Sequence, residues 1–476
     1  MSRRTATDEH EHEAGIATDE HEHGDEHRHV HEQHSAWRRA RSAVLVVLLL
    51  CATAAVAQER PPDPADLINA VLGGLLGFKE VSGPELQEEV AEVGGVPFRA
   101  PVPLDYLSPA DLARYLKDVL DDEYPPARAL ADQRTLVAFD LLPSSVDLRA
   151  VRARVLEENI AGFYDERPGH KRLYAVSEDR TLTPANQLVL SHELRHAMQD
   201  QYADVHRIVP DEVGDFDDRR LAFVSLLEGD ATLVMEKFLV KRLAGAGLGT
   251  GDLSQLSWPV PPVPGVPGVV RDQLVLPYLI GRDFARALQE RGGWDAVKAA
   301  WSTPPVSTEQ VLHPEKFFAH EPPRLVRIAY APPRGRVLAE GVLGELLTRT
   351  LLAGGSTEEP PGFAEEARGP QPTEADVERA AAGWGGDLYR AWDVGGHTLL
   401  VWRTEWDRPE DLREFQDALR RRFERTHTRR AAHGASVFAR GAWSRVIVVS
   451  PDAVTLVAAD DAPLLAAALK AVGGGA

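Results

Sequence analysis

The sequence predicts an α+β protein in two parts, a mainly helical domain with a short β-hairpin and a small α+β domain that follows it. Apolar residues recur at helical spacing through most of residues 107–352. Two β-rich runs, 160–164 and 172–176, enclose the turn-rich stretch DERPGHK and so predict a hairpin. In residues 384–476, strand-like runs such as TLLVW and RVIVV alternate with helical patterns, which predicts the second domain.

The overall composition narrows the function. The chain has 476 residues, enough for more than one domain, and its formal net charge is −20. An acidic protein repels phosphates, so nucleic acid is excluded as a partner. The single cysteine, Cys51, lies in a targeting segment described next. A metal in the mature protein must therefore be held by His, Asp or Glu.

Residues 43–57 predict export. They form one apolar run after three arginines and end in Ala55-Val56-Ala57, a small-x-small pattern typical of a signal-peptide cleavage site. The run is shorter than the roughly 20 residues of a membrane-spanning helix. We therefore expect a cleaved signal and a secreted or otherwise extracytoplasmic protein, with a retained membrane anchor as the alternative.

The segment before this signal, residues 1–42, is rich in histidine and acid. Eight of the 17 histidines lie in its first 34 residues, and ATDEHEH occurs twice. Such a stretch has too few apolar residues to form a core, so we expect it to be disordered. It is either a weak metal-collecting tail or a low-complexity extension without a role in the metal chemistry, and we favour the second interpretation.

Helix signals divide the rest of the chain. Ser108 before Pro109 and Thr183 before Pro184 are N-cap patterns. Gly245 marks a helix end, and a Gly- and Pro-rich connection follows it. The predicted domains are a lead-in over 58–106, the helical domain over 107–352, a linker over 353–383 and the C-terminal domain over 384–476. Within the helical domain, we expect helices at 145–158, 184–202, 219–244 and within 274–350.

The segment His192-Glu193-Leu194-Arg195-His196 carries the candidate chemistry. On a helix, His192 and His196 share one face, one turn apart, which suits two ligands of a tetrahedral zinc ion. Glu193 lies about 100° round the helix from His192. It is badly placed to bind the same ion and well placed to take a proton from a water on it. The alternative is two core histidines beside a surface glutamate.

A third ligand is needed. The arrangement with a third histidine six residues after His196 is excluded, because that position is Tyr202. The following helix offers Glu228 inside an apolar run, where a carboxylate should be paired or bound to metal. Gly229 would let this helix approach the first one closely. The alternative is an ordinary helix with one exposed glutamate.

Two aspartates are candidates for orienting a ligand histidine. Asp230 and, second, Asp200 would accept a hydrogen bond from the ring nitrogen that faces away from the metal.

HELRHAMQDQY, followed at 226–236 by LLEGDATLVME, resembles gluzincin-type (HExxH…E) zinc metallopeptidases, and most closely an uncharacterised family of exported bacterial proteins. The hairpin segment GFYDERPGHKRLYAV and the later LPYLIGRDF also resemble segments of that family, so the resemblance covers about residues 100–320. It implies a zincin-like fold and one Zn²⁺ per chain. His192, His196 and Glu228 would be ligands, Glu193 the general base, and strand 173–176 the edge that binds substrate.

The reaction also needs a donor for the oxyanion of its transition state. Tyr278 and His313 are candidates, because both lie in apolar, turn-rich settings. The alternatives are a core tyrosine and a histidine in a capped turn.

The sequence therefore predicts an exported zinc metallopeptidase acting on peptide or protein substrates. One alternative is a non-enzymatic envelope protein with a structural or degenerate zinc site, against which Glu193 argues. Another is a metal-binding or metal-delivery protein that works through the histidine-rich tail.

Overall fold

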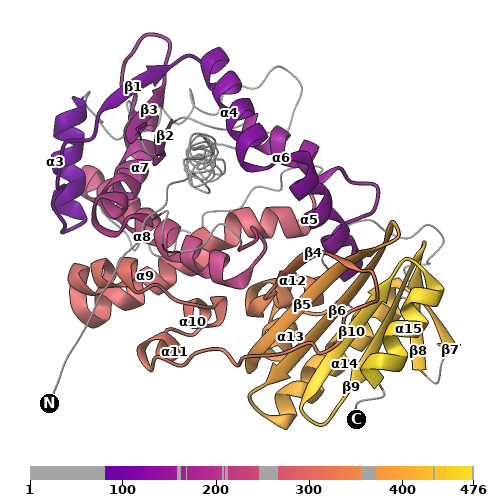
Figure 1. Cartoon of the computed structure of the whole chain (residues 1–476). Coiled ribbons are helices and arrows are strands. Elements are labelled where there is room, and N and C mark those ends of the chain that lie inside the picture. Colours follow the sequence, from indigo (N-terminus) through magenta and orange to yellow (C-terminus); the bar gives the residue numbers. More distant parts are fainter. Residues whose placement is uncertain are drawn as a thin grey trace, which may run out of the picture. The chain divides into compact units, whose positions relative to one another are not determined.

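The computed structural model describes residues 81–157, 162–167, 169–205, 208, 213–245, 266–354, 371–432 and 435–473. The predicted tail, signal segment and part of the lead-in lie outside these residues. Helices and two separate sheets are both present, which confirms the α+β class (Figure 1). None of the helices in the described ranges is long and apolar enough to span a membrane.

The N-terminal part of the described chain is mainly helical. Its elements, in order, are α3 (Gly83–Val93), β1 (Leu104–Leu107), α4 (Pro109–Glu123), α5 (Pro126–Phe139), α6 (Leu148–Glu157), β2 (Gly162–Asp165), β3 (Arg172–Val176), α7 (Pro184–Ala203), α8 (Asp218–Gly245), α9 (Gly268–Ser302), α10 (Thr308–Leu312) and α11 (Pro314–Phe318).

Predicted helix starts are found where the capping patterns place them. The Ser108 hydroxyl accepts a hydrogen bond from the backbone of Asp111 at the start of α4. The Thr183 hydroxyl accepts one from Asn186, whose side chain binds back to the Thr183 backbone, and α7 begins there. These caps satisfy N–H groups that have no partner inside the helix.

The small sheet has the strand order β1-β3-β2. β2 and β3 form the predicted antiparallel hairpin, and β1 pairs with β3 in parallel. The prediction that residues 173–176 form an edge strand is therefore wrong, because β1 covers the second edge of β3. The hairpin strand at the edge is β2. It packs against α7, where a side chain at Gly162 would collide with Leu190.

α8 and α9 form the tightest helix contact near the predicted site. A Cβ atom on Gly229 would lie 1.8 Å from the carbonyl carbon of Gly281, and one on Gly281 would lie 1.8 Å from the backbone oxygen of Ser225. The expectation that Gly229 serves the approach of α8 to α7 is wrong, since its open face meets α9. The missing side chains let the two backbones touch.

The C-terminal part contains a seven-stranded antiparallel sheet in the order β4-β5-β6-β10-β9-β8-β7. It begins earlier than the predicted boundary of 384, because β4 is its first strand. Its elements are β4 (Arg336–Gly341), α12 (Gly344–Ala353), α13 (Glu374–Ala381), β5 (Trp384–Val394), β6 (His397–Trp406), α14 (Pro409–Thr426), β7 (Thr428–Ala432), β8 (Ala435–Arg440), β9 (Trp443–Val449), β10 (Ala453–Ala459) and α15 (Ala462–Gly473).

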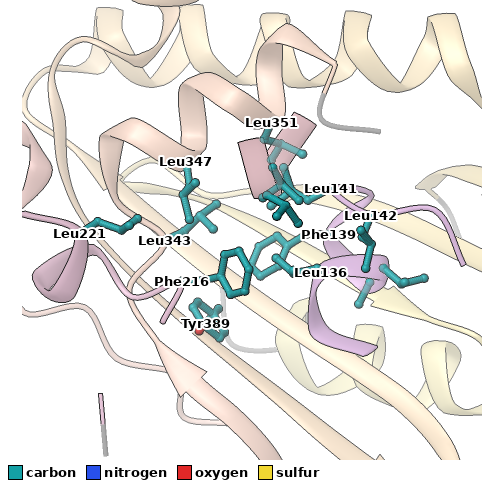
Figure 2. Packing of buried hydrophobic residues seen from close by; sticks show 14 of the residues in the cluster. Leu136, Phe139, Leu141, Leu142, Phe216, Leu221, Leu343, Leu347, Leu351 and Tyr389 are labelled. Carbon is teal, nitrogen blue, oxygen red and sulfur yellow. The ribbon is translucent and has the colours of Figure 1, made fainter. Parts of the chain in front are cut away.

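The two parts share a hydrophobic core. Figure 2 shows side chains from α5, from the start of α8, from α12 and from β5 packed together. The rings of Phe139 and Tyr389 meet edge to face with centroids 5.3 Å apart. Leu347 and Leu351 of α12 are fully buried in the same cluster. The sheet is thus built onto the helical part through continuous apolar packing.

Candidate metal centre

Two helices bring three possible ligand atoms together. Nε2 of His192 and Nε2 of His196 lie 3.0 Å apart on α7. Oε2 of Glu228 on α8 lies 3.1 Å from Nε2 of His192 and 3.3 Å from Nε2 of His196. The two predicted histidines and the predicted third residue therefore form one compact triangle of two nitrogens and an oxygen.

The size of this triangle fits a zinc ion. Tetrahedral zinc binds nitrogen and oxygen at about 2.0–2.1 Å, which places neighbouring ligand atoms about 3.3 Å apart. Candidate ligand atoms of His192, Glu193 and His196 also lie within 4.8 Å of one another. All four side chains are buried, with relative exposures of 0% to 6%. Buried nitrogen and carboxylate ligands without any thiolate are a donor set that zinc accepts.

The triangle stabilises positive charge. Burial alone would lower the pKa of His196, but the Glu228 carboxylate, together with Glu193 and the Gln199 hydrogen bond, outweighs burial and raises the pKa to about 10. Burial would raise the pKa of Glu228, but His196 and His192 outweigh it and lower the pKa to about 2. Because the carboxylate favours a cation beside it, a divalent ion would experience the same attraction.

Glu193 is held at one oxygen and open at the other. The backbone N–H of Tyr164, on edge strand β2, donates to Oε2 of Glu193 over 2.9 Å. Oε1 is buried and has no hydrogen-bond partner within the described ranges. Burial raises the pKa of the Glu193 carboxyl to about 8. A buried carboxylate with one free oxygen, next to a metal-sized triangle, is suited to receive a proton.

The outer nitrogens of the two histidines differ. Nδ1 of His196 lies 2.9 Å from Oε1 of Gln199, whose amide nitrogen donates to the Leu227 carbonyl and to Asp230. Nδ1 of His192 is buried without a hydrogen-bond partner in the part of the chain that the structure describes. The contact expected of Asp230 is therefore made by Gln199, because Asp230 lies one side chain further from the ring.

The two candidate aspartates have other direct partners. Asp230 binds the Arg195 guanidinium through two hydrogen bonds of 2.9 Å and accepts a third from the indole of Trp301. Asp200 accepts from the Tyr164 hydroxyl at 2.9 Å and pairs with Lys171 at 2.9 Å. Asp200 thus anchors the hairpin of β2 and β3 to α7 rather than orienting a histidine.

The two candidate oxyanion donors are separated. The Tyr278 ring of α9 stacks on the His192 ring, with centroids 5.8 Å apart and planes 20° from parallel. Burial raises the pKa of Tyr278 well above its usual value, and the neighbouring Glu228 carboxylate adds to the shift. His313 instead lies 3.0 Å from Glu345 of α12, between α10 and α11. Only Tyr278 joins the candidate centre.

Sequence reasoning missed Gln199 and Tyr164. Gln199 follows His196 by three residues and so lies on the same side of a helix, a spacing that could have identified it. Tyr164 contributes a backbone N–H, which no side-chain pattern reveals. Tyr202, at the position of the excluded third histidine, packs against Trp301 and donates to the Pro97 carbonyl.

Comparison with known protein families gives one match, outside this centre. Residues 334–469 match a family described as a domain of unknown function (DUF8575). This range begins close to β4 and includes the other strands of the seven-stranded sheet, which agrees with an early start of the C-terminal unit. No curated protein and no solved structure matches the chain.

Proposed function

We propose that the chain is a zinc-dependent metallopeptidase with His192, His196 and Glu228 as zinc ligands and Glu193 as general base. The observation that carries the proposal is the position of Glu228, whose Oε2 lies 3.1 Å and 3.3 Å from the two histidine nitrogens. An apolar helix has no structural need for a carboxylate there, because burying it is costly unless a cation compensates.

When bound, zinc supplies a Lewis acid that polarises a carbonyl and lowers the pKa of water to about 7. Glu193 would take the proton of the attacking water at Oε1, while the Tyr164 N–H holds Oε2 in place. The Tyr278 hydroxyl, close to Glu228, would donate to the developing oxyanion. Each of these groups already lies beside the triangle, so little rearrangement is needed.

A peptide substrate suits the strand beside the centre. β2 is an edge strand, and it contacts the general base through its own backbone. A substrate laid along this edge would form hydrogen bonds with backbone groups of β2 other than the Tyr164 N–H, which is bonded to Glu193. We therefore propose that substrate binds along β2, and not along residues 173–176 as the family resemblance implies. Export remains our expectation from residues 43–57.

The test is Glu193→Gln, assayed with wild-type protein on a broad peptide library after zinc content has been measured in both. We expect about one zinc per chain in each protein. Loss of the base should lower the cleavage rate by about 10²–10⁴-fold. If zinc-loaded wild type cleaves nothing, or if both proteins cleave equally, the peptidase proposal fails.

One observation favours a second candidate function, a structural zinc site in a non-enzymatic protein. The side chains of the triangle are almost completely buried, as in closed structural sites. Zinc removal separates the two functions. A structural ion should stabilise the fold without supporting cleavage, whereas a catalytic ion should be required for cleavage.

A further inference from the structure

We propose that the buried Arg195–Asp230 ion pair fixes the Gln199 amide, which accepts a hydrogen bond from Nδ1 of His196 and so orients the ring with Nε2 toward the metal position. The inference rests on the proposed function and makes Gln199 a positioning residue. It concerns a chain of contacts through α7, α8 and α9 rather than the ligand triangle itself.

The orientation of the Gln199 amide is fixed by its surroundings. Its nitrogen lies 3.0 Å from the Leu227 carbonyl and 2.8 Å from Oδ2 of Asp230, which are both acceptors. The reverse orientation would place the amide oxygen against two other oxygens. The amide oxygen must therefore face His196, where it lies 2.9 Å from Nδ1.

Asp230 stays an acceptor because donors surround it. Arg195 donates two hydrogen bonds to its two oxygens, and Trp301 and Gln199 donate to Oδ2. Arg195 is itself completely buried, with its guanidinium carbon 4.8 Å from the ring centroids of both Trp294 and Trp301. A buried charged pair with full hydrogen bonding is rigid and costly to disrupt.

The last step is the state of the His196 ring. The amide oxygen of Gln199 can only accept a hydrogen bond, so Nδ1 of His196 must carry hydrogen whether the ring is neutral or charged. In the neutral ring, the lone pair is then on Nε2, which faces Nε2 of His192 and Oε2 of Glu228. Among the described residues, His192 lacks such a partner at Nδ1, so the two ligands are unequally oriented before metal binding.

Substitution of Gln199 by glutamate tests whether the fixed amide matters, or whether any acceptor beside Nδ1 of His196 would serve. A carboxylate next to a ligand histidine normally strengthens metal binding. In the Gln199→Glu variant, the second oxygen of the new carboxylate would face Asp230 and the Leu227 carbonyl and be repelled by both. We therefore expect Gln199→Glu, as well as Gln199→Leu, to weaken zinc binding by about 10- to 100-fold.

The experiment uses the full chain with ¹⁵N-labelled histidine. In wild type, we expect the hydrogen on Nδ1 of His196 to exchange slowly with water in both the metal-free and the zinc-loaded protein, and we expect its exchange to become fast in Gln199→Leu. Zinc affinity is measured by chelator competition, with Gln201→Leu as matched control. Gln201 is on the same helix but bonds Arg99 and Ala100, so wild-type affinity is expected.

Fast exchange of the Nδ1 hydrogen in metal-free wild type would overturn the inference and leave the proposed function standing. Tighter or unchanged zinc binding by Gln199→Glu would also overturn it. Absence of zinc binding by wild type would instead contradict the proposed function. The measurement on Nδ1 of His196 in the metal-free protein would still test whether Gln199 orients the ring.

Discussion

Gly229 of α8 and Gly281 of α9 meet backbone to backbone, and this contact positions the candidate centre. Gly229 directly follows the ligand candidate Glu228, and Gly281 lies three residues after Tyr278. The crossing therefore brings the Tyr278 ring onto His192 and its hydroxyl near Glu228. A side chain at either glycine would separate the helices that hold these groups.

The first prediction is that Gly281→Ala destabilises the protein. Its new Cβ would lie 1.8 Å from the backbone oxygen of Ser225, which cannot rotate away. Such overpacking should lower the free energy of unfolding by about 1–3 kcal/mol or more, measured by urea denaturation. The matched control is Gly245→Ala at the exposed end of α8, where a Cβ meets nothing within 4 Å. Equal stability of the two variants would contradict the tight crossing.

The second prediction concerns Tyr278→Phe. The stacked ring on His192 is kept, and only the hydroxyl is lost. If the hydroxyl serves the oxyanion, kcat should fall by about 10²–10³-fold while zinc affinity stays within a few-fold of wild type. His313→Gln, which disturbs the pair with Glu345 away from the triangle, should leave kcat unchanged. A loss of zinc affinity with an unaltered kcat would show that Tyr278 supports Glu228 instead.

The third prediction is a pH dependence of stability from His427 in the C-terminal unit. Burial lowers the pKa of His427 to about 3, and the nearby Arg445 adds to the shift while Asp140 opposes it. The unfolded chain, with a histidine pKa of about 6.5, therefore binds a proton that the folded chain does not. This stabilisation is complete above pH ~6.5 and is lost as pH falls toward ~3.

The measurement is the free energy of urea unfolding of wild type and His427→Gln between pH 7 and 4. The variant should show a shallower decline, by up to about 1.4 kcal/mol per pH unit. The control is His397→Gln, at an exposed position on β6, and the decline should be shallower for His427→Gln than for this control. Parallel curves for His427→Gln and wild type would contradict the assignment.

The fourth prediction separates the centre from the histidine-rich N-terminus. Deletion of residues 1–34 removes eight histidines. About one tightly bound zinc per chain should remain after dialysis against a weak chelator, because the three proposed ligands lie on α7 and α8. Zinc content is measured by elemental analysis of the purified protein. Loss of the tight zinc on deletion would favour the metal-delivery alternative.

Local signals predicted much of the fold. The caps at Ser108 and Thr183 give the starts of α4 and α7, and Gly245 gives the end of α8, because these signals act within one helical turn. The pairing of β1 with β3, and that of β4 with β5, joins segments far apart in the chain, and no local pattern encodes it. The predicted edge strand failed for that reason, and β4 was missed as the first strand of the C-terminal sheet.

Some residues of the candidate site could be predicted from the sequence, and others depend on how the helices pack. Spacing on one helix placed His192, Glu193 and His196, and an isolated carboxylate in an apolar run identified Glu228. The sequence could not rank Asp230 against Gln199, because the order of side chains in a buried hydrogen-bond chain depends on how α7 and α8 pack. The Tyr164 contact uses backbone and leaves no trace in residue type.

The most direct test of the central claim is a crystal structure of the zinc-loaded protein with anomalous diffraction at the zinc edge. We expect one strong peak about 2.0–2.2 Å from Nε2 of His192, Nε2 of His196 and a carboxylate oxygen of Glu228. No peak, or a peak bound elsewhere with Glu228 turned away, would contradict the account.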